Sequence, residues 1–272
     1  MSLIKSIKII STKEHKDVLM EDLDIVFESV NFAESDYKLS DFESAEASAD
    51  DKKIIEKYNS MVALTVWDKL KDIKNIYFTD EYFSLDEDER VSYFFHEICH
   101  FIVYSKNNES EKILAERQKI DKNCRDSNFS SGEILAKHTH CYLLTLFNEQ
   151  LTDKLMIKLK PELFIKKLKS SIKSHYESIE STTNLYDLYN QLIDVMRSTE
   201  LIKDNENFSE ELKKLQQAKE TTTKKLKEEC DDGNRFNVYM EFKEKLLVSY
   251  KSENALSTIE TFNQLISKLI FC

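Results

Sequence analysis

The chain of 272 residues carries a net charge of −11, and 33% of its residues are charged while 41% are hydrophobic. This length allows one large domain or two smaller ones, and the 16 Phe and 12 Tyr supply a hydrophobic core. The negative charge argues against nucleic acid as a partner, because its phosphates would be repelled. The chain has only 2 Gly and 1 Pro, which favours long helices with few tight turns.

The sequence contains no apolar run of transmembrane length, and its N-terminus lacks the apolar core and cleavage site of a secretory signal. We therefore expect a cytoplasmic protein, or one delivered into a host cytosol by a non-Sec secretion system. The five cysteines are widely spaced and form no C-x-x-C pair, which indicates reduced thiols. Cys99 is interpreted as a small buried apolar residue.

The first fifty residues predict a strand, a helix and a connection. Residues 3–10 are rich in β-branched side chains, which favours a strand. Residues 13–30 carry apolar side chains at helical spacing. Residues 31–50 are acidic and Ser-rich, and we expect an exposed connection or a short helix there.

The next segment predicts a helix followed by a short strand. Residues 51–71 favour a helix, although the stretch 61–67 (MVALTVW) could also form a buried strand. Residues 75–79 (NIYFT) predict a strand. If this strand lay at a sheet edge, it could bind an extended peptide as a further strand; plain core packing is the alternative.

A long helix is then predicted over residues 84–106. Ser84 and Glu87 have the spacing of a capping box, and acidic residues fill the first turn, where the helix dipole favours negative charge. Apolar residues between positions 94 and 102 recur at three- and four-residue steps, so one side of the helix can be buried.

This helix contains an H-E-x-x-H sequence, formed by His96, Glu97 and His100. Residues four apart lie on one helix face, so both imidazoles can offer a nitrogen to one metal ion. Glu97 can reach a water molecule on that ion. With 6 His in the chain, roughly 0.01 such sequences are expected by chance. The competing interpretation is a pair of buried, hydrogen-bonded histidines with an incidental Glu.

Catalytic zinc usually takes three protein ligands, so a third is expected further along the chain. The metzincin pattern fails, because Val103 and Lys106 stand where it needs Gly and His. The remaining candidates are carboxylates and histidines: Glu109, Glu111, Glu116, Glu133, His138, His140 and His175.

Glu133 is favoured among these candidates, because it begins an apolar helical pattern that could pack against the first helix. His140 falls near the same face and could either orient a metal ligand or polarise a substrate carbonyl as a catalytic residue. His138 lies on another side of that helix. The alternative for Glu133 is a capping box with Ser130, which has the right spacing.

The H-E-x-x-H sequence with a Glu on a second helix resembles the gluzincin branch of the zincin metallopeptidases. The resemblance covers roughly residues 75–145, where Glu133 begins an E-x-x-A sequence similar to that of the branch. It implies Zn²⁺ held by His96, His100 and Glu133, with Glu97 as general base. The chain departs from the family in having few turn glycines near the expected cleft.

After residue 150 the pattern is helical throughout, and a Lys-rich stretch over 154–173 is interpreted as a solvated face. The predicted helices cover residues 151–159, 161–180, 183–202, 209–230, 235–249 and 252–271. We therefore expect an α+β, predominantly helical fold. It would comprise a zincin-like catalytic domain with a short sheet over 1–150 and a helical domain for substrate recognition or scaffolding over 151–272.

The expected function is zinc-dependent endopeptidase activity on a protein substrate. The composition and the helical C-terminal half are similar to bacterial effector proteases that act inside host cells, and this resemblance implies host actin as a candidate substrate. Two alternatives stay open. The chain could be a non-catalytic helical interaction module with a structural or vestigial metal site, or a regulator that cleaves one protein only.

Overall fold

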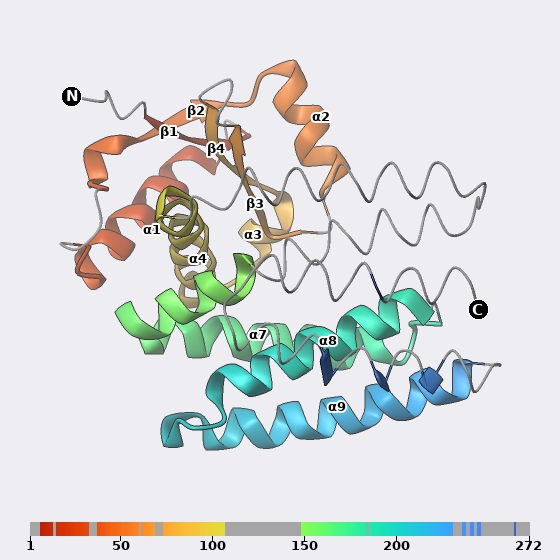
Figure 1. Ribbon diagram of the computed structural model, residues 1–272. Coiled ribbons are helices and arrows are strands. Elements are labelled where there is room, and N and C mark those ends of the chain that lie inside the picture. Colours follow the sequence, from red (N-terminus) through yellow and green to blue (C-terminus); the bar gives the residue numbers. More distant parts are fainter. Residues whose placement is uncertain are drawn as a thin grey trace. The chain divides into compact units, whose positions relative to one another are not determined.

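The computed structural model describes residues 6–12, 15–32, 37–59, 61–68, 73–106, 148–183 and 185–230, with single positions between 236 and 264. The fold is α+β and predominantly helical, with a small four-stranded mixed sheet (Figure 1). This confirms the fold class expected from the sequence.

The chain divides into two compact units. The first comprises residues 1–106 with 152–167, and the second comprises residues 107–151 with 168–272. This division differs from the boundary expected near residue 150 in two stretches: residues 107–150 fall in the second unit, and residues 152–167 fall in the first.

The sheet lies in the first unit and has the strand order β2-β1-β4-β3. Its strands are β1 (Ile7–Ser11), β2 (Phe42–Glu46), β3 (Ala63–Asp68) and β4 (Ile73–Phe78). β1 pairs in parallel with β2 and β4, whereas β3 pairs antiparallel with β4. Among the described strands, β3 is therefore an edge and β4 is internal. The strand predicted at residues 75–79 is thus present as part of β4, and of its two alternatives core packing applies rather than an edge position.

The described helices of the first unit surround this sheet. They are α1 (Lys16–Ser29), α2 (Ala49–Lys57), α3 (Asp80–Ser84) and α4 (Glu87–Lys106), with the 3-10 turn η2 (Leu39–Asp41). A further helix is described over residues 148–159, and its residues from 152 onward belong to this unit. α1 and α4 pack on each other, and α4 also contacts β3. The predicted strand at 3–10 and helix at 13–30 are confirmed over their described residues.

The alternation of side chains along β3 places a helix on each face of the sheet. Leu64 and Val66 join a cluster that includes Tyr77 and residues of α2. Trp67 lies on the other face, with its ring centroid 6.2 Å from that of Phe101 in α4. Because successive strand residues point to opposite faces, one short strand serves both layers.

Two predictions between residues 31 and 71 are wrong. Residues 42–46 form β2 rather than a connection, and residues 63–68 form β3 rather than the end of a helix. The stretch 61–67 satisfies both periods because it is apolar in most positions, so its partner strand decides its structure. The alternative prediction of a strand over this stretch is confirmed.

The start of α4 also differs from the predicted capping box. Ser84 ends α3, and its hydroxyl donates to the carbonyl of Glu81. Asp86 accepts the backbone N–H of Glu89 at 2.9 Å instead, which is the bond that an N-cap residue makes. The acidic first turn of α4 is nevertheless present, with Glu87 and Glu89 in it.

Aromatic side chains fix α4 against the sheet. The ring centroid of Phe78 at the end of β4 lies 4.8 Å from that of Phe94 and 4.4 Å from that of Tyr82. The α4 residues Phe94, Phe95, Ile98 and Phe101 have no exposed surface. Burying such side chains stabilises the fold by about 1.5–3 kcal/mol each, so the helix is held firmly by its apolar face.

The second unit consists, in its described part, of helices. They are α7 (Pro161–Ile179, which begins in the first unit), α8 (Leu185–Ile202) and α9 (Ser209–Glu229), with the 3-10 turn η3 (Glu206–Phe208). α8 and α9 pack on each other, and α9 buries a stripe that runs from Leu215 to Leu226. The predicted helices at 151–159, 161–180, 183–202 and 209–230 are confirmed. Those at 235–249 and 252–271 lie almost wholly outside the described residues.

A buried ion pair joins three helices of the first unit. Asp22 in α1 is 1% exposed and accepts the Nε–H of Arg90 in α4 at 2.9 Å. It also accepts the hydroxyl of Tyr82 in α3 at 2.8 Å. Burial, with Asp22 beside it, raises the pKa of Tyr82 well above its usual value, so the phenol stays protonated and donates. Asp22 therefore connects α1 to both α3 and α4.

We expect D22A to lower the free energy of unfolding by about 3 kcal/mol, because it leaves the partly buried Arg90 guanidinium without its partner. Urea unfolding followed by circular dichroism measures this loss. The matched control is D24A, which changes an exposed carboxylate on the same helix and should cost less than about 0.5 kcal/mol. Equal midpoints for the two variants would contradict the role given to Asp22.

Candidate metal centre

His96 and His100 lie on one face of α4, as the H-E-x-x-H spacing predicts. Their ring centroids are 4.6 Å apart with an interplanar angle of 79°. The two residues are 3% and 6% exposed, so both imidazoles are buried. A buried imidazole needs partners for its ring nitrogens, and these come from the helix at residues 148–159.

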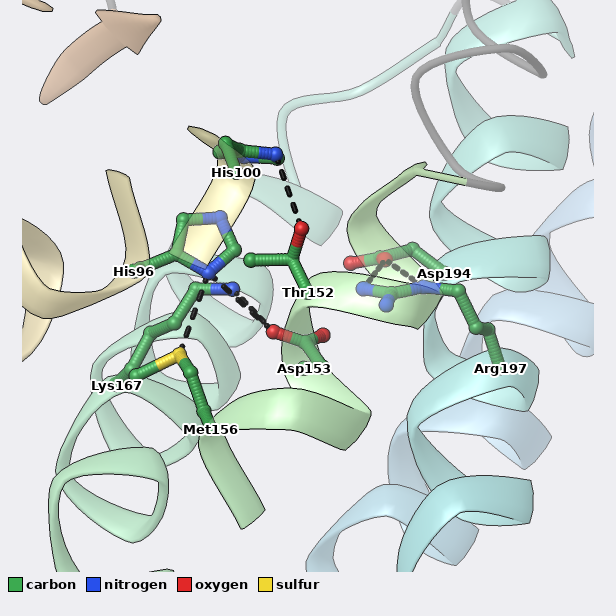
Figure 2. Close-up of polar contacts among 8 residues, drawn as sticks. All are labelled: His96, His100, Thr152, Asp153, Met156, Lys167, Asp194 and Arg197. Atoms are coloured by element: carbon green, nitrogen blue, oxygen red, sulfur yellow. Dashed lines mark hydrogen bonds and ion pairs between the residues drawn. The ribbon is translucent and has the colours of Figure 1, made fainter. Parts of the chain in front are cut away.

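The helix at residues 148–159 meets both histidines at Nδ1 (Figure 2). Thr152 Oγ1 lies 3.0 Å from His100 Nδ1. Asp153 Oδ1 lies 3.5 Å from His96 Nδ1, and Met156 Sδ lies 3.4 Å from the same nitrogen. Contacts at Nδ1 orient each ring and favour Nε2 as the nitrogen offered to a metal ion.

Lys167 from α7 completes this arrangement. Its Nζ lies 2.8 Å from Asp153 Oδ1, the same oxygen that faces His96. The Asp153 side chain is 3% exposed and that of Lys167 is 11% exposed, so the ion pair is largely buried from solvent. A buried carboxylate needs such a counter-charge, because desolvation would otherwise disfavour its charged form. Lys167 therefore holds Asp153 in place beside His96.

Glu149 supplies a carboxylate to the same group. It lies one turn before Asp153 on the 148–159 helix and is half-buried. Ligand atoms of His96, His100 and Glu149 all lie within 4.8 Å of one another. The division between the two units falls after residue 151. Glu149 and Asp153 nevertheless lie on one continuous helix.

The donor set of this group fits a metal ion. Two imidazoles and one carboxylate are ligands that zinc takes in sites with three protein ligands. The donors come from two helices, and the imidazoles are oriented by further contacts, as in known metal sites. The residues His96, His100 and Glu149 could therefore hold a metal ion.

Glu97 follows His96 on α4 and turns toward β3. The hydroxyl of Thr65 donates to Glu97 Oε2 at 2.5 Å and lies 3.4 Å from the Glu97 carbonyl oxygen. Glu97 is 6% exposed. A buried carboxylate thus follows the first histidine along α4 and is held by a hydroxyl from the edge strand of the described sheet.

The predicted site residues have different outcomes. His96, Glu97 and His100 lie where the helical pattern predicts. Glu133 and His140 lie outside the described residues, as do the other early candidates Glu109, Glu111, Glu116 and His138. His175 lies in α7, where its Nε2 is 3.0 Å from Thr222 Oγ1 and burial lowers its pKa. Both His175 and its partner Thr222 belong to the second unit.

Glu149 was missed because its helix was predicted to begin at residue 151. The available signal was the spacing of Glu149 and Asp153, which puts two carboxylates on one helix face. Cys99 is free and fully buried, as expected, and burial raises the pKa of its thiol well above the usual value. It is not a member of the group.

Comparison of the chain with protein-family models, with curated proteins and with solved structures finds no match. Within the described residues, none of the helices combines the length and the apolar character that a membrane crossing requires.

His96, His100 and Glu149 are the expected metal ligands. Loss of a residue that only contacts a ligand weakens metal binding by about 10- to 100-fold. We expect H96A, H100A and E149Q each to weaken Zn²⁺ binding by more than this. Competition with a chromophoric chelator measures the affinity. E177Q, at an exposed position of α7, is the control. Unchanged affinity in E149Q together with a loss in E133Q would assign the third position to Glu133.

Asp153 is expected to support the His96 ligand. We expect D153N to weaken Zn²⁺ binding by about 10- to 100-fold, because it removes the charge beside His96 Nδ1. The same chelator competition gives the value. K167M removes the counter-charge but keeps the carboxylate in the chain, so we expect it to weaken binding less than D153N does. D187N, which changes an exposed carboxylate of α8, is the control. A larger loss in K167M than in D153N would show that the ion pair, and not the contact with His96, matters.

Proposed function

We propose that the protein is a zinc-dependent endopeptidase. The observation that carries this proposal is the group of His96, His100 and Glu149, with the Glu97 carboxylate on the next residue of the same helix. A metal ligand set and a separate carboxylate are the two parts that metal-assisted hydrolysis needs. The likeness of the H-E-x-x-H helix to the zincin metallopeptidases adds to this support.

The roles of the residues follow from their chemistry. When bound, a zinc ion polarises a carbonyl and lowers the pKa of water. His96, His100 and Glu149 would hold the ion, and Thr152 and Asp153 orient the two imidazoles. Glu97 takes a proton from water and passes it to the leaving amine, which is the part of a general base and acid.

The sheet offers a means of binding an extended peptide. β3 lies at an edge of the described sheet, and Thr65 of this strand touches Glu97. A peptide added alongside β3 would gain backbone hydrogen bonds and would run past the carboxylate. This supports a protein substrate rather than a small amide. The similarity to bacterial effector proteases makes actin the first candidate to test.

One observation favours a second function. The two histidines are 3% and 6% exposed, and each has a described partner at Nδ1. A structural metal site, or a hydrogen-bonded core without metal, would also show this burial. In that case the chain would be a non-catalytic helical interaction module, and Glu97 would not matter for function.

The two functions predict different results for E97Q. If the protein is a peptidase, E97Q retains zinc but loses activity by about 10²- to 10⁴-fold, because the base is gone and the ligands remain. The assay mixes purified zinc-loaded protein with cell lysate or with actin and identifies new protein termini by mass spectrometry. A chelator should abolish them, and zinc should restore them.

The matched control is E87Q, which changes an exposed carboxylate in the first turn of α4. It should cleave as the wild-type protein does. Wild-type turnover in E97Q would contradict the peptidase proposal. The absence of new termini from the wild-type protein in every lysate, combined with stable zinc binding, would favour the structural metal site.

A further inference from the structure

We infer that Thr65 is a positioning residue that holds the Glu97 carboxylate in its working orientation, an inference that rests on the proposed function. The hydroxyl of Thr65 donates to Glu97 Oε2 at 2.5 Å, a short distance typical of a hydroxyl bound to a carboxylate. Because Thr65 occupies one carboxylate oxygen, Oε1 is left to take up and release a proton.

The backbone fixes this contact from both sides. Thr65 pairs with Ile76 in the antiparallel ladder between β3 and β4, so its position along the strand is set by the register. Glu97 is fixed by α4, whose residues Phe94 and Phe101 have no exposed surface. A β-branched side chain in a strand also has few rotamers. The hydroxyl is therefore held toward the carboxylate at little further cost in entropy.

A neighbouring contact shows that Thr65 lies on the face of β3 that meets α4. Two residues further along the strand, Trp67 packs its ring 6.2 Å from that of Phe101, and Phe101 lies one turn after Glu97. Residues i and i+2 of a strand share a face, as residues i and i+4 of a helix do. Thr65 contacts Glu97, and Trp67 contacts Phe101, on the same face of β3. The two contacts together fix the position of β3 relative to the Glu97 carboxylate.

This arrangement links the substrate strand to the base. A peptide added alongside β3 would lie beside the strand that supplies the hydroxyl, so one element would both align the substrate and orient the carboxylate. An orienting hydrogen bond of this kind acts on the chemical step. It should change kcat and leave KM close to its wild-type value.

The experiment compares T65V and T65S with the wild-type protein. Valine keeps the branched shape of Thr65 and removes the hydroxyl, whereas serine keeps the hydroxyl. We expect T65V to lower kcat by about 10- to 100-fold, part of the about 10²- to 10⁴-fold that a positioned base contributes, with zinc content unchanged. T65S should restore most of the loss. T199V, which removes a hydroxyl that donates to a carbonyl within α8, is the control.

A second measurement does not depend on activity. In metal-free protein, the thermal midpoints of the wild-type protein, T65V, E97M and the double variant form a double-mutant cycle. Methionine keeps the length of Glu97 but cannot accept the hydrogen bond from Thr65. We expect the shift caused by T65V to shrink in the E97M background. Additive shifts would show that the contact is absent and would overturn the inference.

The failures of the two proposals can be told apart. If the wild-type protein cleaves its substrate and T65V cleaves it equally fast, the inference about Thr65 is wrong and the peptidase proposal stands. A fall in kcat that T65S does not restore would likewise overturn it. If the wild-type protein cleaves nothing, the proposed function fails and the role of Thr65 fails with it, whatever the cycle shows about the contact.

Discussion

The burial of α4 against the sheet is the constraint on which the rest of the first unit depends. Phe94, Ile98 and Phe101 have no exposed surface, and Phe78 packs onto Phe94 from the end of β4. A helix fixed by its apolar face leaves its polar residues with one orientation only. His96, Glu97 and His100 are therefore placed by packing before any ligand is considered.

The second part of the site depends on charge rather than on packing. Asp153 lies beside His96 and forms a largely buried ion pair with Lys167. Neither charge would be stable there alone, because burial of an unpaired charge is costly. The 148–159 helix thus contacts the first imidazole through Asp153, and Lys167 of α7 holds Asp153 in turn. Together these two residues restrict the orientation of the ring more than one contact would.

The sequence predicted those features that one segment determines by itself. The helical spacing placed His96 and His100 on one face, and the apolar periodicity predicted α1 and the described helices after residue 150. β3 was ambiguous, because an apolar stretch satisfies both the helical and the strand period until a partner strand is known. Glu149 was missed for a similar reason. Its proximity to the histidines arises from tertiary contact, and no local pattern encodes that contact.

The group of His96, His100 and Glu149 brings together segments that are distant in the chain. In the unfolded chain these donors would be far apart, so an ion would bind the folded form in preference to the unfolded one. By mass action such an ion acts as a removable cross-link between α4 and the 148–159 helix, comparable in effect to a disulfide. The stability of the first unit would then follow the concentration of free metal in its surroundings.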